Sequence, residues 1–542
     1  MRTHFDVLVV GAGMAGIYSV YRFRNDGLSV HALEAGSGVG GTWFWNRYPG
    51  ARCDVESLDY SFSFSDDLQR EWKWSEQFAA QPEIRAYLDA VVDRFGLGDH
   101  FTFNATVESA AWDTERSLWL VEAAGKSYSA KYLIMATGLL SVPVDPQIPG
   151  LERFSGDVLR TAEWPEGVEL SGRAVGLFGN GSSGMQVLPA VAEVAKRITL
   201  FQRTGAYAVP VRNAPITNEE HEAACATYAA RREATRKSAV GTYWSAYLNG
   251  EKSVFEVDDA ERLREFEKFW DMGGPGFLIA YNDLLTDLKA NKLASDFARD
   301  QIRSIVKDPV LAEKLQPPSE LPLGCKRLAV ENGYFDAFNR DNVDLVSLKE
   351  EPLISVEPDG IRLEDRFIPL DTIILATGFD AYSGAMLKMR IRGDGVELRD
   401  AWAEGPENYL GLGMAGFPNL FTINGANAPA SNFFLVTEAQ VDWLSGLIAH
   451  AEKVGARRID TAKAGEVEWR RHIEEVAAYV TVTNHCVTWF RGTNIEGRPA
   501  KVMNYLAGLN AWNDYAAAVE QEGYRHFSFG MSKEPSTLQD YR

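Results

Sequence analysis

Two copies of the pattern Gly-x-Gly-x-x-Gly in the sequence follow an apolar run typical of a strand and precede a predicted helix. The first copy lies in FDVLVVGAGMAGIYSVYRFRNDGLSVHALEAG and the second in RAVGLFGNGSSGMQVLPAVAEVAKRITLFQRT. Glycines at this spacing permit a tight turn, let the backbone approach a pyrophosphate at the helix N-terminus, and allow close packing of helix on strand. The chain is therefore predicted to be an α/β protein with two Rossmann-like dinucleotide-binding domains. The residues concerned are Gly11, Gly13 and Gly16 in the first turn, and Gly179, Gly181, Ser182, Ser183 and Gly184 in the second.

The two copies differ where a ribose-binding residue is expected. The strand SVHALE ends at Glu34, eighteen residues after Gly16, and a carboxylate there accepts hydrogen bonds from ribose hydroxyls. The same count from the second turn reaches an amide, Gln202, which Arg203 and Thr204 follow. Without the carboxylate a 2′-phosphate is not repelled, and an arginine binds one directly. We therefore expect FAD at the first site and NADPH at the second, with electrons passing between them.

Composition and charge exclude several other classes of protein. The 542 residues carry a net charge of −20, which argues against non-specific binding to nucleic acid. No apolar run is long enough to span a membrane, and the N-terminal MRTHFDVLVVGAGMAG is typical of a strand and turn rather than a signal peptide. The four cysteines are scattered and form no C-x-x-C pair, which argues against a dithiol reductase and a zinc site. We expect a cytoplasmic protein without a metal, a nucleic-acid partner or a membrane partner.

Recurring strand ends and a change of composition predict the domain organisation. The segments KYLIMATGLLSVP and LDTIILATGFDAY both end an apolar strand at Ala-Thr-Gly, and LSVPVDPQIPGLERF is a proline-containing connection. The stretch 215–324 is charged, alanine-rich and helical in pattern, and its charges are expected to form a solvated face. We predict a discontinuous FAD-binding domain at 1–140 and 380–542. The predicted NADPH-binding domain covers 150–214 and 325–378, with 215–324 as a helical insertion.

Two further stretches connect the chain to a known family. GGTWFWNRYPGARCD, residues 40–54, is similar to a pattern of Gly-x-Trp, four spacers, an aromatic-Pro-Gly and an Asp. FSGDVLRTAEWP, residues 154–165, matches the fingerprint Phe-x-Gly-x3-His-x3-Trp-Pro except that Arg160 replaces the histidine. With the paired nucleotide turns, these stretches make essentially the whole chain resemble the Baeyer–Villiger monooxygenases. These are class B flavoprotein monooxygenases, and the resemblance is to the cyclohexanone and phenylacetone monooxygenase type.

The resemblance implies a reaction. In this family NADPH reduces FAD, and the reduced flavin forms a C4a-peroxyflavin that inserts one oxygen atom of O2 into a ketone to give an ester or lactone. An arginine suits the anionic intermediates because it is permanently cationic and offers directed donors. In PLGCKRLAVENGYF, Arg327 aligns with the family's catalytic arginine. Asp54 would orient Arg327 and offset its desolvation.

The resemblance also extends the cofactor sites. Lys326 would join Arg203 and Thr204 on the 2′-phosphate of NADPH, because adjacent side chains of an extended segment face opposite sides. Trp489, in CVTWFRGTNIEGRP, aligns with a tryptophan that contacts the nicotinamide ribose, in a stretch that resembles a mobile lid. In the 40–54 stretch the residues expected to bind cofactor are Gly41, Thr42, Trp43 and Asp54.

Three alternatives stay open at this point. A flavin N- or S-oxygenating monooxygenase shares both nucleotide turns but has less use for an arginine that stabilises a peroxide. An uncoupled NADPH oxidase is compatible with Arg160, which we expect to alter coupling or NADPH affinity while leaving the fold intact. A flavoprotein that only binds or senses would not need Lys326, Arg327 and Asp54. The loop NGANAPASNFFLV resembles one that lines the family's substrate pocket, with Asn432, Phe433 and Phe434 as candidates for ketone selectivity.

Overall fold

The computed structural model describes residues 3–531. The first of its sheets, which begins with β1, has eight strands. The strands lie in the order β17-β4-β5-β6-β1-β2-β3, and β18 also pairs with β6. β1, β2, β3, β6 and β18 are mutually parallel, whereas β5 is antiparallel to both of its neighbours. The strands are β1 (His4–Val10), β2 (Val30–Leu33), β3 (Phe101–Thr102), β4 (Val107–Asp113), β5 (Leu118–Ala123), β6 (Lys126–Met135), β17 (Arg390–Arg392) and β18 (Leu420–Thr422).

The first glycine-rich turn joins β1 to α1 (Met14–Asn25) in the way that the sequence predicts. Val7, Leu8 and Val9 are fully buried, as expected for a parallel strand covered on both faces. A Cβ added to Gly16 would lie 2.0 Å from the carbonyl oxygen of Gly11. Helix and strand therefore approach each other more closely than any residue but glycine allows.

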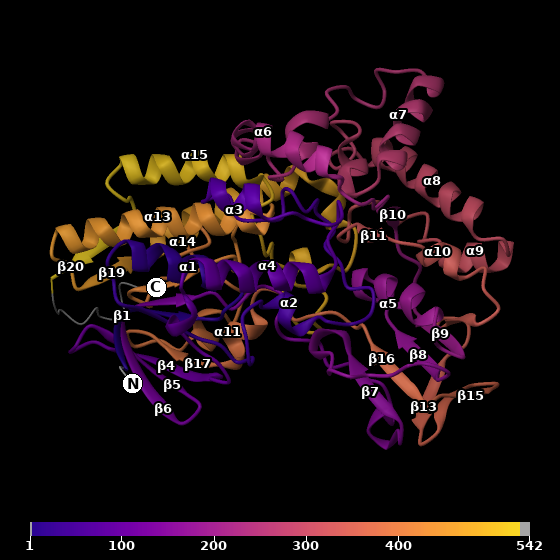
Figure 1. The fold of residues 1–542 in the computed structure, drawn as a ribbon, viewed down its shortest axis with the longest axis horizontal. Helices are drawn as coiled ribbons and strands as arrows, with labels where there is room; N and C mark the ends of the chain where they lie inside the picture. The colour runs from indigo at the N-terminus through magenta and orange to yellow at the C-terminus, as the bar shows by residue number, and fades with distance from the viewer. Residues whose placement is uncertain (1–2, 532–542) are drawn as a thin grey trace.

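A second sheet contains only parallel pairs, in the order β12-β9-β8-β16-β7. The second glycine-rich turn connects β8 to α5 (Ser182–Ala192). Both sheets are visible in Figure 1, the first at the lower left and the second at the lower right. The strands are β7 (Asp157–Arg160), β8 (Ala174–Phe178), β9 (Arg197–Gln202), β12 (Val343–Ser347) and β16 (Thr372–Leu375), and β13 (Leu353–Glu357), β14 (Gly360–Leu363) and β15 (Phe367–Pro369) form a small antiparallel sheet beside them.

The stretch 215–324 is helical, as predicted, but the expectation that its charges are solvated is wrong for part of α6 (Asn218–Arg236). Arg232 is only 3% exposed and donates to the side chains of Gln69 and Ser61 and to the carbonyl of Asp59. Arg231 pairs with the buried Asp59 at 2.8 Å. These arginines attach the insertion to the 56–69 segment beside the first sheet. The other helices of the stretch are α7 (Asp259–Met272), α8 (Leu288–Ile305) and α9 (Pro309–Leu315).

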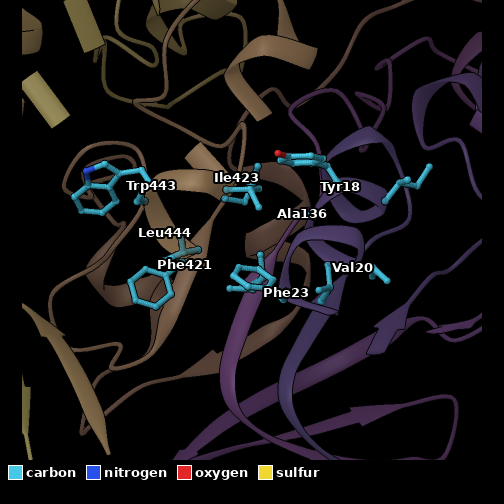
Figure 2. Close-up of a cluster of buried hydrophobic side chains, with 14 of the residues drawn as sticks. Tyr18, Val20, Phe23, Ala136, Phe421, Ile423, Trp443 and Leu444 are labelled. Atoms are coloured by element: carbon cyan, nitrogen blue, oxygen red, sulfur yellow. The ribbon is translucent and has the colours of Figure 1, made fainter. Parts of the chain in front are cut away.

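The C-terminal helices complete the core around α1. Figure 2 shows Tyr18 and Phe23 of α1 gathered with Phe421 of β18 and with Trp443 and Leu444 of α13. The two ends of the chain thus share one core, while the domain boundaries given above remain a prediction. Across residues 3–531 no helix has the length and apolar character needed to cross a bilayer. The remaining elements are α2 (Thr42–Trp45), α3 (Asp66–Glu71), α4 (Gln81–Arg94), α10 (Tyr334–Ala337), α11 (Gly384–Lys388), α12 (Leu398–Ala401), α13 (Phe433–Lys453), α14 (Lys463–Tyr479), α15 (Gly508–Gln521), β10 (Ala208–Pro210), β11 (Ala329–Glu331), β19 (Arg458–Thr461) and β20 (Phe527–Gly530).

Candidate active site

Arg327 and Asp54 meet although 273 residues separate them in the sequence. The Nη2 atom of Arg327 lies 2.5 Å from Oδ2 of Asp54, and Nε lies 3.2 Å from the same oxygen. The attraction of Asp54 is the largest influence on the guanidinium and raises the pKa of Arg327, outweighing burial. The side chain nevertheless keeps 45% of its surface exposed. Arg327 is therefore a fixed cation with donors left to offer to a further partner.

The loop that carries Asp54 is held against the second nucleotide-binding unit by hydrogen bonds to α5. The hydroxyl of Tyr48 donates to Oε1 of Gln186 at 2.8 Å and lies 3.3 Å from Oγ of Ser183. The Nε2 atom of Gln186 donates to the carbonyl of Arg52 at 3.0 Å. A cavity of about 230 Å³ lies in this contact, and its lining includes Cys53 and Gln186. These bonds place Asp54 within reach of Arg327.

The first glycine-rich turn fits a pyrophosphate. No side chain caps the N-terminus of α1 and its first turn has no acidic residue, so its free N–H groups suit an anion. The Oε2 and Oε1 atoms of Glu34 accept from the backbone N–H groups of Ala12 and Gly36, both at 2.7 Å. Each carboxylate oxygen has a second lone pair, so Glu34 fixes the turn and can still accept from a ribose hydroxyl. Gly41 has a φ of +55° and lies against Gly13, where a Cβ would come within 2.9 Å of the Gly13 Cα.

The second turn fits a nucleotide by the same criteria. The N-terminus of α5 also lacks a side-chain cap and an acid in its first turn, and the space beside Gly181 is open. The Nδ2 atom of Asn180 donates to Oε1 of Gln202 and to the carbonyl of Thr204, at 2.9 and 2.8 Å. The Asn180 amide therefore orders the chain from Gln202 to Thr204, where the sequence predicts the ribose-binding position. Gln202 itself is buried and donates to the carbonyl of Lys314, so its role is structural.

A cavity of about 280 Å³ adjoins Arg203 and Thr204. Lys326 is close enough to Arg203 that repulsion between them, after burial, lowers the pKa of Lys326. Within residues 3–531 neither Lys326 nor Arg203 forms an ion pair. Sequence reasoning missed Arg299, which also lines the cavity and whose buried Nε has no hydrogen-bond partner among the described residues. The lining also includes Glu313 and Glu350, and Glu350 is paired with Lys314. Cations still outnumber acids, and one arginine donor is unsatisfied, which suits a phosphate.

Trp489 is connected to Arg327 through Tyr382, a residue that the sequence reasoning did not select. Its ring centroid is 5.7 Å from that of Tyr382, which is 5% exposed and close enough to Arg327 to influence its pKa. Tyr382 follows Ala-Thr-Gly-Phe-Asp-Ala and has a φ of +65°, a left-handed backbone uncommon outside glycine. Its place after the second Ala-Thr-Gly was the only signal that could have indicated it.

The family fingerprint at 154–165 contacts the first stretch. The backbone N–H of Trp164 donates to the carbonyl of Trp45 at 3.2 Å, and Trp164 is buried. Arg160 lies at the end of β7 and pairs at 2.5 Å with Asp145, which belongs to the proline-containing connection. Its effect on coupling stays a prediction. Of the candidate selectivity residues, Asn432 caps α13 and Phe434 is fully buried against Tyr60, so only Phe433 is left half-buried.

A disulfide joins Cys325 to Cys486, with their Cα atoms 6.2 Å apart. This pairing was not predictable from the sequence, because 161 residues separate the two cysteines. Cys53 and Cys225 are free thiols. Residues 3–531 contain no group of three or more histidine, cysteine or acidic residues placed to hold a metal ion.

Two nucleotide-binding α/β units with a fixed guanidinium between them define a flavin- and nicotinamide-dependent oxidoreductase. A family profile described as pyridine nucleotide-disulphide oxidoreductase matches residues 5–230. The only cysteines in that range are Cys53 and Cys225, which are both free, so the match reflects the nucleotide-binding fold and not a reactive dithiol.

Comparison with known proteins narrows this class. The chain is 38% identical to a phenazine N-monooxygenase from Lysobacter antibioticus over 99% of both chains. It is 39% identical to a Baeyer–Villiger monooxygenase from Pseudooceanicola batsensis, over 96% of this chain and 95% of the relative. The crystal structure of cyclohexanone monooxygenase from Rhodococcus sp. Phi1 bound to NADP+ superposes with a TM-score of 0.95 at 39% identity, over 98% of this chain and 100% of the other.

The chain belongs to the Baeyer–Villiger monooxygenases among the class B flavoprotein monooxygenases. It is an FAD- and NADPH-dependent enzyme that inserts one oxygen atom of O2 into a ketone to give an ester or lactone. The predicted fold class, enzyme class and cofactors are thereby confirmed. The roles of individual residues stay predictions.

Proposed function

We propose that Arg327 is the catalytic cation of this ketone oxidation and that Asp54 positions it. The observation that carries the proposal is the contact of Arg327 with Asp54 through two nitrogens of the guanidinium, which leaves Arg327 charged and partly exposed. Such a cation stabilises negative charge on a reacting oxygen and does not protonate it. When bound, FAD supplies the oxygen-activating chemistry and NADPH the hydride. The chain supplies the fixed charge, its orientation and the exclusion of water.

The cofactors are proposed to occupy separate units. FAD would lie on the unit formed by 1–140 and 380–542, at the first glycine turn with Glu34 and the segment 41–43. NADPH would lie on the unit formed by 150–214 and 325–378, with its pyrophosphate at the N-terminus of α5. Arg203, Thr204 and Lys326 would receive the 2′-phosphate, and Trp489 would contact the nicotinamide ribose. The uncapped helix ends and the cation group beside the 280 Å³ cavity support these assignments.

The enzyme is proposed to oxidise ketones in preference to aromatic nitrogen compounds. The cytoplasm is proposed as its site of action. One relative is named for N-oxygenation of a phenazine. Attack on a ring nitrogen requires an electrophilic oxygen, whereas attack on a carbonyl requires an anionic one. A guanidinium held charged by a carboxylate stabilises the anion, so the observed pair favours the ketone reaction.

A single assay separates these reactions. The purified holoenzyme is given NADPH and either a cyclic ketone, a phenazine or no substrate, while O2 uptake, hydrogen peroxide and organic product are measured together. We expect uptake matched by ester or lactone with the ketone. N-oxide formation without any ester would contradict the proposal, as would peroxide equal to the O2 consumed in every case.

A further inference from the structure

The Cys325–Cys486 disulfide joins two segments that the proposed function places on opposite sides of the NADPH site. Cys325 directly precedes Lys326 and Arg327 and is fully buried. Cys486 lies three residues before Trp489, in the stretch between α14 and α15. One covalent bond therefore links the predicted phosphate-binding lysine to the predicted nicotinamide contact.

Residues 484–499, which include Cys486, are otherwise held by a small number of noncovalent contacts, whereas residues 502–505 are buried in the core. Between α14 and α15 the regular structure consists only of two short 3-10 helices, Thr481–Asn484 and Trp489–Arg491. Arg498 pairs with both oxygens of Asp380 at 2.8 and 3.0 Å, and Asn494 donates to the carbonyl of Phe379 at 3.0 Å. Segments with little regular hydrogen bonding open at a low free-energy cost. The disulfide is the contact that such opening cannot break.

We propose that Cys325 and Cys486 form a reversible thiol–disulfide site whose oxidised state fastens residues 484–499 over the bound nicotinamide nucleotide and slows its exchange. This proposal rests on the assignment of Lys326 and Trp489 to NADPH. While the bond is intact, the Trp489 side of the site stays close to the Lys326 side. Once the bond is reduced, residues 484–499 are held by the Arg498–Asp380 pair, the contact of Trp489 with Tyr382 and a few hydrogen bonds, and the nucleotide enters and leaves more readily.

The two sulfurs differ in access, which sets the order of the chemistry. Cys486 is half-buried and is flanked by His485 and by Val487, which is 63% exposed, whereas Cys325 is fully buried. A small thiolate attacks Sγ of Cys486, forms a mixed disulfide, and releases Cys325 as a thiolate that takes up a proton. A second small thiolate attacks the small-molecule sulfur of the mixed disulfide and frees Cys486. In sum, one protein disulfide and two small thiols give two protein thiols and one small disulfide, and an excess of that small disulfide reverses the process.

The experiment uses the FAD-loaded enzyme in a buffer of reduced or oxidised glutathione. Alkylation and mass measurement count the free thiols, limited proteolysis reports the mobility of residues 484–499, and rapid mixing gives the rate of NADP+ release. We expect release to be roughly 5- to 150-fold slower in the oxidised enzyme, the usual range for two coupled sites. Cys325→Ser and Cys486→Ser should release NADP+ at the reduced rate in both buffers. Because Cys486 is partly exposed, its variant serves if the buried Cys325→Ser fails to fold.

Cys225→Ser is the matched control, because Cys225 is a free thiol and has been given no role in the site. It should keep the full response to glutathione. Equal NADP+ release in the two buffers, with the bond shown to be present in one and absent in the other, overturns the proposal. So does failure of Cys325 and Cys486 to pair in oxidised glutathione. The underlying nucleotide assignment fails separately, if Lys326→Ala in reduced glutathione binds NADPH and NADH with unchanged relative affinity.

Discussion

Lys326 and Arg327 are adjacent cations in opposite electrostatic surroundings. The carboxylate of Asp54 raises the pKa of Arg327, whereas burial and the neighbouring Arg203 lower the pKa of Lys326. Arg327 already has its anion, and its charge is secured at every physiological pH. Lys326 gains a favourable partner only when an anion binds beside it. This difference supports the proposed roles, in which Arg327 serves chemistry that must not lose its charge and Lys326 recognises a phosphate.

The role of Arg327 predicts a selective loss of one step. Arg327→Ala should lower the rate of ester formation by about 10²- to 10³-fold or more, as when a donor to an oxyanion is removed. Reduction of the flavin by NADPH should persist, because the guanidinium is assigned to the oxygen chemistry. Flavin absorbance in rapid mixing measures reduction, and chromatography measures the ester. Arg327→Lys keeps the charge but loses the planar fork, so intermediate ester formation is expected. Ester formation at the wild-type rate in Arg327→Ala would remove the assigned role.

The 2′-phosphate assignment predicts a change in cofactor preference. Arg203→Ala should reduce kcat/KM for NADPH roughly 10- to 100-fold, because a hydrogen bond to a charged group contributes about 1.5–3 kcal/mol. The value for NADH should change little, since NADH lacks the phosphate. Arg197→Ala is the control: Arg197 begins β9, the strand that Arg203 follows, and is exposed, but it pairs with Asp344. Equal losses for both cofactors in Arg203→Ala would place Arg203 elsewhere in the site.

At the scale of elements, α6 is joined to the 56–69 segment by buried charge. Asp59 is fully buried and accepts from Arg231 and from the backbone N–H of Tyr243, both within 2.8 Å. Arg232 donates to the Asp59 carbonyl and is also deprived of water, and that burial lowers its pKa. The Asp59 carboxylate, together with Glu56, which accepts from Arg231 at 2.8 Å, therefore helps to compensate the burial of the two guanidinium groups. Asn432 at the start of α13 donates to the same carbonyl at 2.8 Å, so this point connects three segments.

Removing that carboxylate should destabilise the protein. Asp59→Asn keeps the size of the side chain but removes the fully buried carboxylate and leaves Arg231 with Glu56 as its one paired anion among the described residues. Breaking a buried pair costs about 3–5 kcal/mol. Urea denaturation followed by circular dichroism measures the change in the free energy of unfolding. The control is Glu233→Gln in the same helix, because Glu233 pairs with Lys237 at the surface and such pairs contribute little. Equal stabilities of the two variants would show that the buried network is dispensable.

Local patterns were predictable from the sequence, and contacts between distant segments were not. The two glycine turns and the contrast between Glu34 and Gln202 depend on spacings within about thirty residues, where strand, turn and helix are set locally. The Arg327–Asp54 pair was accessible only through family resemblance. The disulfide and the burial of Arg232 depend on how separate segments pack. A charge pattern alone cannot distinguish an exposed helix face from one compensated by a distant carboxylate.

At the scale of the whole molecule, the active site lies where two separately formed units meet. Figure 1 shows the two sheets lying apart, with α2 between them and α5 against the second sheet. Asp54 follows the loop of the first unit, and Arg327 precedes a strand beside the second. Their contact therefore depends on how the units are docked. The hydrogen bonds of Gln186 to Tyr48 and to the Arg52 carbonyl set that docking on one side of the site.

This dependence predicts that a change outside the site uncouples it. Gln186→Leu keeps the volume of the side chain but removes both hydrogen bonds, each contributing about 0.5–1.5 kcal/mol. FAD and NADPH should still bind and flavin reduction should persist, because their proposed contacts are untouched. The fraction of O2 released as hydrogen peroxide should rise several-fold, since Arg327 and Asp54 would be held less firmly. Peroxide and ester measured in the same reaction give this fraction. Gln301→Leu on α8, remote from the Tyr48 and Arg52 contacts, should leave the fraction unchanged. If Gln186→Leu converts O2 to ester as efficiently as the unaltered enzyme, then docking at α5 does not control the Arg327–Asp54 pair.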